Sequence, residues 1–321
     1  MQRGRIFYTV SDDNHPSGGE KHSYQHVDVL NESGFEAYAL HTNKGTHNTW
    51  FENRTRVIDM DSFWDLYNME RDYIVIPETL AANASSLPGK KVIFNKNLYH
   101  GYVSFGRTKP PSYSYTDSKV VAAFAVSDHN LRHLQFAFPG AKIFRMYAHI
   151  DCGLFAFRSL GDKQRRIAFS VKSRVPLHVL CHTLMARNAT GLNNLQDYEL
   201  TFLEGFSEQQ MVRVLQDSLI LIFLGTYEGL PRTVLEAMAC GCLVVGYGTG
   251  PLKECLPAAY QFEPDDFLSI AQRIESIMRA FPSEIDSLAP LTEKGREIAE
   301  AFTLERQKAS LISAWNEIMA R

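Results

Sequence analysis

The chain has 321 residues, of which 45% are hydrophobic and 21% are charged, and its formal net charge is -3. This length is enough for two α/β domains with separate cores, and the even mixture of charges lacks the basic stripe typical of nucleic-acid binding. The N-terminal apolar run is too short for a secretory signal and no segment is long enough to span a membrane. We therefore expect a cytoplasmic protein and leave peripheral membrane contact open.

Cysteines and short basic clusters carry little functional signal. The five cysteines are an odd number at irregular spacing, so reduced and mostly buried thiols are expected. Cys240 and Cys242 have no second ligand pair at the spacing of a zinc site, so no metal is predicted. The clusters at residues 90–91 and 163–166 are more often a solvated rim than a phosphate-binding stripe.

The first half of the chain alternates strand-like and helical segments. Apolar β-rich runs occur at residues 5–10, 37–40, 56–60, 73–77, 91–95, 120–126 and 142–147. Between the first two runs, Tyr24, Val27 and Leu30 keep a helical spacing over residues 20–34, and Gly34 is a helix stop. Alternation of this kind predicts a doubly wound, mostly parallel sheet.

The same alternation begins again in the second half. Strands are predicted at residues 166–170, 199–204, 219–225 and 242–248, and helices at 176–187, 207–218 and 232–241. We therefore predict an N-terminal Rossmann-like domain at residues 1–150 and a C-terminal one at 151–303. An amphipathic helix at 304–321 is expected to pack back on the first domain.

The turn Gly229-Leu230-Pro231 lies between a predicted strand and a predicted helix. Free amides at a helix N-terminus, aided by the helix dipole, bind anions. Carboxylates bind hydroxyls well, so Glu228 before the turn and Glu236 inside the helix suit a sugar and a ribose on either side of a diphosphate. From spacing alone, a strand end at Glu228 and a solvated helix face at Glu236 explain the stretch equally well.

A resemblance favours the functional interpretation. The stretch YEGLPRTVLEAMACGCLVVG (227–246) resembles the E-x7-E signature of retaining GT-B glycosyltransferases of family 4. Gly18-Gly19-Glu20 resembles the N-terminal Gly-Gly loop of that family, and residues 246–254 resemble its later Gly-rich turn. Residues 126–155 resemble the crossing between its domains. The resemblance implies two Rossmann-like domains with the active site in the cleft between them.

The resemblance also implies roles for individual residues. Glu228 would contact the hydroxyls of the donor sugar, Glu236 those of the ribose, and Glu254 would orient the donor. The diphosphate would be bound by the backbone of Gly229, Leu230, Pro231, Arg232 and Thr233. Lys172 and Arg174 match the basic pair that stabilises the charge of the leaving diphosphate. Their Lys-Ser-Arg spacing departs from the Arg-x-x-x-Lys spacing of the family.

The first domain offers weaker candidates. Gly18 and Gly19 allow close backbone approach to a phosphate or to the acceptor. His100 is the candidate for a histidine near the reacting carbon, and Asn95 and Asn97 are candidate acceptor contacts. For each of these residues an ordinary turn or a polar loop position is the alternative interpretation.

The resemblance, together with these candidate residues, implies a hexosyltransferase. It would transfer a sugar from a nucleotide diphosphate sugar, such as a UDP-sugar or a GDP-sugar, to a carbohydrate or other hydroxyl acceptor, with retention of configuration. No cofactor or metal is expected, because helix amides and Lys172 with Arg174 neutralise the diphosphate.

One alternative is a catalytically degenerate GT-B protein that binds a nucleotide or a partner protein. Another is an epimerase or a phosphorylase on the same scaffold; a nicotinamide dehydrogenase is weaker, because no G-x-G-x-x-G follows a predicted strand.

Overall fold

A computed structural model describes residues 3–103 and 114–320 and divides the chain into two compact units. The first unit comprises Met1–His149 together with Leu304–Arg321, and the second comprises Ile150–Thr303. The observed division after residue 149 lies one residue before the predicted one.

The first unit is built on a seven-stranded sheet in the order β3-β2-β1-β4-β5-β6-β7, in which every pair is parallel. Its strands are β1 (Ile6–Thr9), β2 (Ala37–His41), β3 (Val57–Asp59), β4 (Tyr73–Pro77), β5 (Lys90–Asn95), β6 (Val120–Ala125) and β7 (Ile143–Arg145). The chain moves outward in one direction from β1 and in the other from β4. Loops at the carboxyl ends of β1 and β4 therefore flank the switch point where α/β folds bind ligands.

Helices connect these strands, as parallel pairing requires. They are α1 (Gly18–Glu32), α2 (Met60–Leu66), α3 (Leu98–Val103) and α4 (Asp128–Ala137), with 3-10 turns at Glu78–Ser86 and Ser114–Thr116. Helix α1 begins two residues before the predicted start because Ser17 caps it, its hydroxyl accepting from the Glu20 amide. The predicted stop is confirmed, since Gly34 adopts φ 81° directly after the C-cap.

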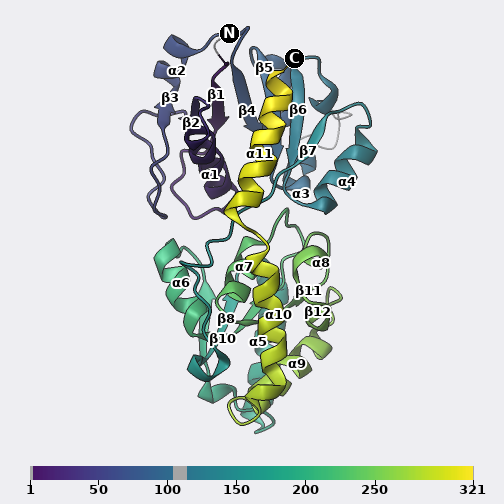
Figure 1. The fold of residues 1–321 in the computed structure, drawn as a ribbon. Coiled ribbons are helices and arrows are strands. Elements are labelled where there is room, and N and C mark those ends of the chain that lie inside the picture. The colour runs from purple at the N-terminus through teal and green to yellow at the C-terminus, as the bar shows by residue number, and fades with distance from the viewer. Residues whose placement is uncertain (1–2, 104–113, 321) are drawn as a thin grey trace. The chain divides into compact units, whose positions relative to one another are not determined.

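The C-terminal helix α11 (Leu304–Met319) belongs to the first unit and lies along its sheet (Figure 1). Trp315 on this helix is fully buried and its indole N–H lies 3.4 Å from the Tyr8 hydroxyl. The Trp315 ring also meets the rings of Tyr73 and Phe124 edge-on. The last segment of the chain is thus part of the core of the first unit.

The second unit repeats the pattern with a five-stranded parallel sheet in the order β12-β11-β10-β8-β9. Its strands are β8 (Gln164–Ser170), β9 (Glu199–Leu203), β10 (Ser218–Phe223), β11 (Leu243–Tyr247) and β12 (Gln261–Phe262). Its helices are α5 (Arg174–Ala189), α6 (Glu208–Asp217), α7 (Arg232–Ala239), α8 (Leu252–Cys255), α9 (Phe267–Ala280) and α10 (Ile285–Glu300), with 3-10 turns at Leu160–Asp162, Leu195–Asp197 and Ala258–Tyr260. The order reverses between β8 and β10, which is the switch point of this sheet.

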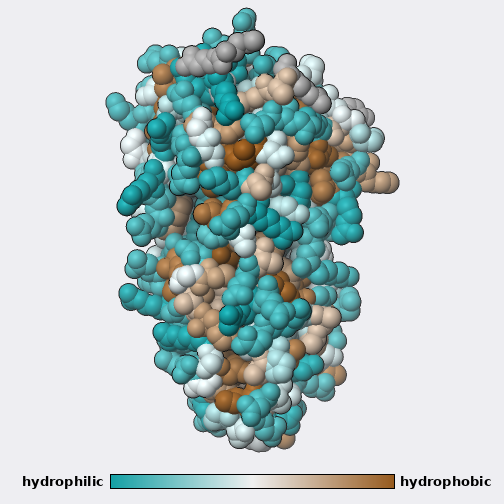
Figure 2. Space-filling view, viewed as in Figure 1, coloured by the Kyte–Doolittle hydropathy of each residue, from teal (hydrophilic) through white to brown (hydrophobic). Residues whose placement is uncertain are grey.

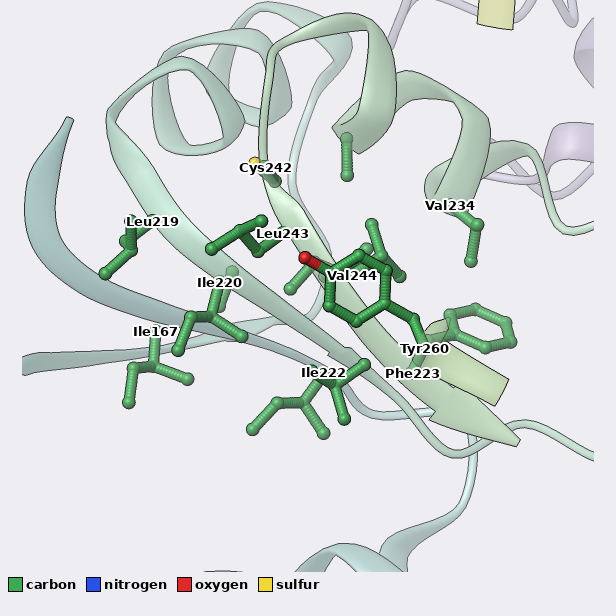
Figure 3. Packing of buried hydrophobic residues seen from close by; sticks show 14 of the residues in the cluster. Ile167, Leu219, Ile220, Ile222, Phe223, Val234, Cys242, Leu243, Val244 and Tyr260 are labelled. Carbon is green, nitrogen blue, oxygen red and sulfur yellow. The ribbon is translucent and has the colours of Figure 1, made fainter. Parts of the chain in front are cut away.

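The core of the second unit explains its unbroken apolar strands. Strands β10 and β11 are buried along their whole length because helices cover both faces of a parallel sheet. Figure 3 shows Ile167 of β8, Ile220 and Ile222 of β10 and Val244 of β11 packed together, with Val234 of α7 beside them. The sheet and α7 therefore form one rigid support for the loops at the carboxyl edge.

The surface agrees with the balanced composition. On the face that Figure 2 shows, hydrophilic residues dominate and apolar residues form separate small patches. Cys152 is half-buried and the other four cysteines are buried, and all five are free, which confirms the expectation of reduced thiols. Burial raises the pKa of the Cys240 thiol.

The expectation of a solvated basic rim is wrong for two lysines. Lys91 is fully buried and its ammonium donates to the carbonyls of Leu87 and Gly89, each at 2.8 Å. Lys163 is buried as well and donates to three carbonyl groups. Hydrogen bonds to carbonyls make the burial of an ammonium group tolerable, so these lysines hold the backbone rather than face solvent.

Candidate active site

The loops after β8 and β10 meet at the switch point of the second unit. The first loop carries Lys172 and the second carries Glu228, whose side chains are 62% and 15% exposed. The Lys172 ammonium lies 4.0 Å from a carboxylate oxygen of Glu228. The structure therefore brings together the residues that the sequence assigns to the phosphate and to the sugar.

Arg174 is the first residue of α5 and stands on the same edge of the sheet. A cation in the first turn of a helix is opposed by the helix dipole, and α5 has no acidic residue there. The Arg174 guanidinium instead pairs at 2.7 Å with Glu204, which directly follows β9. Sequence reasoning missed Glu204, although a charged residue at the carboxyl end of a parallel strand is a usable signal.

The N-terminus of α7 narrows the set of amides that can bind a diphosphate. Pro231 is the N-cap rather than the first helical residue, and no side chain caps this end of the helix. Pro231 has no N–H to donate, and the Arg232 amide already donates to the Leu230 carbonyl at 2.9 Å. The amide donors in the predicted set are therefore reduced to those of Gly229, Leu230 and Thr233.

Glu236 lies one helical turn further along α7 and is buried, with a relative exposure of 9%. Its carboxylate lies 3.7 Å from Nε of Arg232, which is buried to a similar degree. Burial lowers the pKa of the Arg232 guanidinium, and the neighbouring Glu236 raises it. The alternative of a solvated helix face is therefore wrong for Glu236.

Lys163 fixes α7 from its other end. Its ammonium donates to the Leu215 and Gln216 carbonyls at the end of α6 and to the Cys240 carbonyl at the end of α7. A cation at two helix C-termini is favoured by both dipoles. The C-terminal end of α7 is thus tied to the end of α6 by the buried ammonium of Lys163.

Glu254 lies in α8, a four-residue helix after β11. Strand β11 neighbours β10, so the loop that carries Glu254 leaves the same edge of the sheet as Glu228. The side chain of Glu254 is half-buried and its amide donates to the Pro251 carbonyl. This position is compatible with the predicted role in orienting the donor.

In the first unit the predicted residues gather around the switch point of its own sheet. Gly18 and Gly19 are the first residues of α1, and a Cβ at Gly19 would lie 3.3 Å from Cδ of Lys96. The close approach of Lys96 thus explains a small residue at Gly19. His100 lies on α3, the helix that follows β5 after a short loop, and its side chain is exposed.

Two charged residues at this edge, Lys96 and Glu78, were missed from the sequence. The Lys96 ammonium pairs with Glu20 at 2.9 Å, and the Lys96 amide donates to the buried carboxylate of Glu78 at 2.9 Å. Burial raises the pKa of Glu78, whereas the charge of Lys96 lowers it. Lys96 directly follows β5 and Glu78 directly follows β4. A charged residue at the carboxyl end of a predicted parallel strand could therefore have identified both as site candidates.

The candidate acceptor contacts behave differently from each other. Asn95 is buried, its amide nitrogen donating to the Tyr115 hydroxyl and its amide oxygen accepting from Asn130. This internal network removes Asn95 from any ligand, so that prediction is wrong. The side-chain oxygen of Asn97 accepts hydrogen bonds from the backbone amides of Tyr99 and His100 and so caps the start of α3.

Metal and membrane features were also sought within the described ranges. Residues 3–103 and 114–320 hold no group of three or more His, Cys, Asp or Glu side chains arranged to bind a metal ion. In the same ranges no helix has both the length and the apolar character needed to cross a bilayer.

Part of the second unit matches a known protein family. Residues 192–286 match the family model described as "Glycosyl transferases group 1", a range that includes Glu204, Glu228, Glu236 and Glu254. No curated protein sequence matches the chain.

Solved structures match the whole chain at low identity. Sucrose-phosphate synthase from Thermosynechococcus elongatus is 13% identical with a TM-score of 0.71, over 99% of this chain and 100% of that one. A glycosyltransferase from Rickettsia africae is 14% identical with a TM-score of 0.69, over 99% of both chains. The pneumococcal O-GlcNAc transferase GtfA, solved with UDP and GlcNAc, is 9% identical with a TM-score of 0.67, over 100% of both chains. The predicted GT-B fold is therefore confirmed, and the match of residues 192–286 to a glycosyltransferase family model agrees with the prediction of a transferase.

Proposed function

We propose that the protein transfers a sugar from a nucleotide diphosphate sugar to an acceptor hydroxyl, with retention of anomeric configuration, as in family 4 glycosyltransferases. The observation that carries the proposal is the switch point of the second unit. There Lys172 lies 4.0 Å from Glu228, and the uncapped N-terminus of α7 follows on the same loop. Cations, helix amides and a carboxylate are the groups that a diphosphate next to a sugar requires.

Each residue has a defined task in this proposal. Lys172 and Arg174 stabilise the negative charge that grows on the leaving diphosphate as the glycosidic bond breaks. The amides of Gly229 and Thr233 bind the same diphosphate from the α7 side. Glu228 accepts hydrogen bonds from the sugar hydroxyls and fixes the orientation of the anomeric carbon.

A UDP-sugar is the first donor to test, because the pneumococcal relative was solved with UDP. We propose that the diphosphate is neutralised by protein groups without a metal, given the two cations and the α7 amides at the site. The role of His100 and the acceptor contacts of the first unit stay predictions.

The experiment is a transfer assay with UDP-, GDP- and ADP-linked glucose, galactose, mannose and N-acetylglucosamine, each offered with a panel of mono- and disaccharide acceptors and with EDTA present. Release of one nucleoside diphosphate is expected, and Glu228→Gln should release it about 100-fold more slowly. A proton NMR spectrum of the product should show the anomeric configuration of the donor. An inverted product would contradict retention, and no release from any donor by a folded sample would favour the catalytically degenerate alternative.

A further inference from the structure

The side chain of Arg232 pairs with that of Glu236, and the proposed function assigns no role to this pair. The two side chains are only 8% and 11% exposed, and Nε of Arg232 lies 3.7 Å from Oε1 of Glu236. The sequence assigns only the Arg232 backbone to the diphosphate, and in the structure that amide donates to the Leu230 carbonyl instead. Its buried guanidinium needs a separate explanation.

The position of Arg232 is electrostatically unfavourable without a nearby anion. It is the first residue of α7, where the helix dipole presents partial positive charge, and it is removed from water. Burial and the dipole both disfavour a cation at this place. Glu236 supplies the compensating charge one turn along the same helix.

The geometry of the pair leaves the carboxylate able to bind a ligand. A separation of 3.7 Å is beyond the range of an N–H to O hydrogen bond, so the attraction is electrostatic and uses none of the carboxylate lone pairs. Helix α7, which carries both residues, packs closely on α10, because a Cβ at Gly295 of α10 would lie only 3.1 Å from the Met238 side chain. The attraction thus draws the Glu236 carboxylate toward Arg232 and leaves its lone pairs for a ligand.

We propose that Arg232 is a positioning residue that holds the Glu236 carboxylate in place to bind the ribose hydroxyls of the nucleotide. This inference rests on the proposed function, since it assumes that the donor is a ribonucleotide bound at the α7 end of the site. It assigns to the Arg232 side chain the recognition of ribose through Glu236, with no direct contact to the sugar.

The test measures how well the protein distinguishes a ribonucleotide from its counterpart without ribose hydroxyls. Calorimetric titrations use UDP, GDP and ADP, each paired with its 2′,3′-dideoxy analogue. For the diphosphate that binds, we expect the wild-type protein to prefer the ribonucleotide by about 10- to 100-fold, the value of a charge-assisted hydrogen bond. Glu236→Gln should reduce the preference to within about 3-fold.

Arg232→Met keeps much of the side-chain length and removes the charge. We expect it to lose most of the preference as well, and the double variant with Glu236→Gln should lose no more than either single variant, because the two residues act as a unit. Arg232→Lys keeps the charge but reaches less far, so its preference should be intermediate. The matched control is Arg296→Met, which removes the cation of an exposed pair with Glu300 on α10 and should leave the preference unchanged.

Several outcomes would overturn the proposal. A merely structural role for Arg232 would weaken ribonucleotide and dideoxy binding equally, which leaves the ratio at its wild-type value. If Arg232→Met does not fold, a wild-type ratio in Arg232→Lys contradicts the proposal by itself. Wild-type binding without any preference for ribose removes the inference but not the proposed function, whereas a folded protein that binds none of the diphosphates refutes both.

Discussion

Removal of Lys172 and Arg174 together should weaken the binding of a nucleoside diphosphate far more than the binding of the bare nucleoside. Two charges 4 Å apart attract by about 1 kcal/mol in water and about 4 kcal/mol at an effective dielectric constant of 20. The two side chains are 62% and 72% exposed, so solvent screening favours the lower end of that range. We therefore expect about 1 to 1.5 kcal/mol from each cation, which together correspond to an affinity loss of about 30- to 150-fold.

The assay is isothermal titration calorimetry of the wild-type protein and Lys172→Ala/Arg174→Ala with UDP and with uridine. Uridine binding should change little, because the nucleoside carries no phosphate. The difference for UDP should shrink at 1 M salt, where the Debye length is about 3 Å. Equal losses for UDP and uridine, or a loss insensitive to salt, would refute the assignment of these cations to the diphosphate.

Glu204 provides an internal control for the same prediction. It pairs with Arg174 at 2.7 Å and competes with a bound diphosphate for that cation. Glu204→Gln should therefore raise UDP affinity by about 2- to 5-fold, the scale of an exposed ion pair. A lower affinity would show that Glu204 supports the site instead of competing for it.

Three further predictions concern the sugar, the fold and the response to acid. Glu228→Gln should keep UDP affinity within about 3-fold and slow transfer by about 100-fold, because it misplaces the sugar and not the nucleotide; equal effects on both would contradict its role. Lys163→Met removes a charged donor from the carbonyls of Leu215, Gln216 and Cys240, of which Leu215 keeps the Cys242 thiol and Cys240 keeps the Arg158 amide. It should cost about 2 to 3 kcal/mol in urea unfolding, whereas a loss below about 0.5 kcal/mol would refute the clamp on α6 and α7. Burial and the charge of Lys96 lower the pKa of His26 to about 3. At pH values between about 3 and 6.5 the imidazole is therefore protonated in the unfolded chain and neutral in the folded one. Between pH 6.5 and about pH 3, stability should therefore fall by about 1.4 kcal/mol per pH unit through this residue. His26→Phe should show a correspondingly shallower dependence, and an identical slope would contradict the burial of a neutral imidazole.

The fold was predictable because its signal is local. Unbroken apolar runs such as residues 219–225 alternate with helical spacing, and that alternation specifies parallel strands with covered faces. Element ends differ by a residue or two, as at α1, where the Ser17 cap places the start at Gly18. The short strand β12 (Gln261–Phe262) was not predicted, because its two residues give no pattern of their own.

The candidate site was predictable only where its residues are close in sequence. Glu228 and Glu236 were identified from one contiguous motif, and the structure adds that Glu236 is buried. The partners of the cations come from distant segments and leave no local pattern: Arg174 meets Glu204 from the next strand, and Lys163 meets the Cys240 carbonyl 77 residues away. Burial of a charged group is decided by such long-range partners, so composition alone misplaced Lys163 and Lys91 on the surface.

Hydrogen–deuterium exchange with and without the bound diphosphate tests most directly whether the donor site lies at the carboxyl edge of β8 and β10. UDP, GDP and ADP are screened by calorimetry in EDTA, and the tightest is used at saturation. The account predicts slower exchange in the loop at residues 171–174 and in residues 225–236, and the loss of this protection in Glu236→Ala at the same ligand concentration. Saturating binding that leaves both segments unprotected would contradict the site.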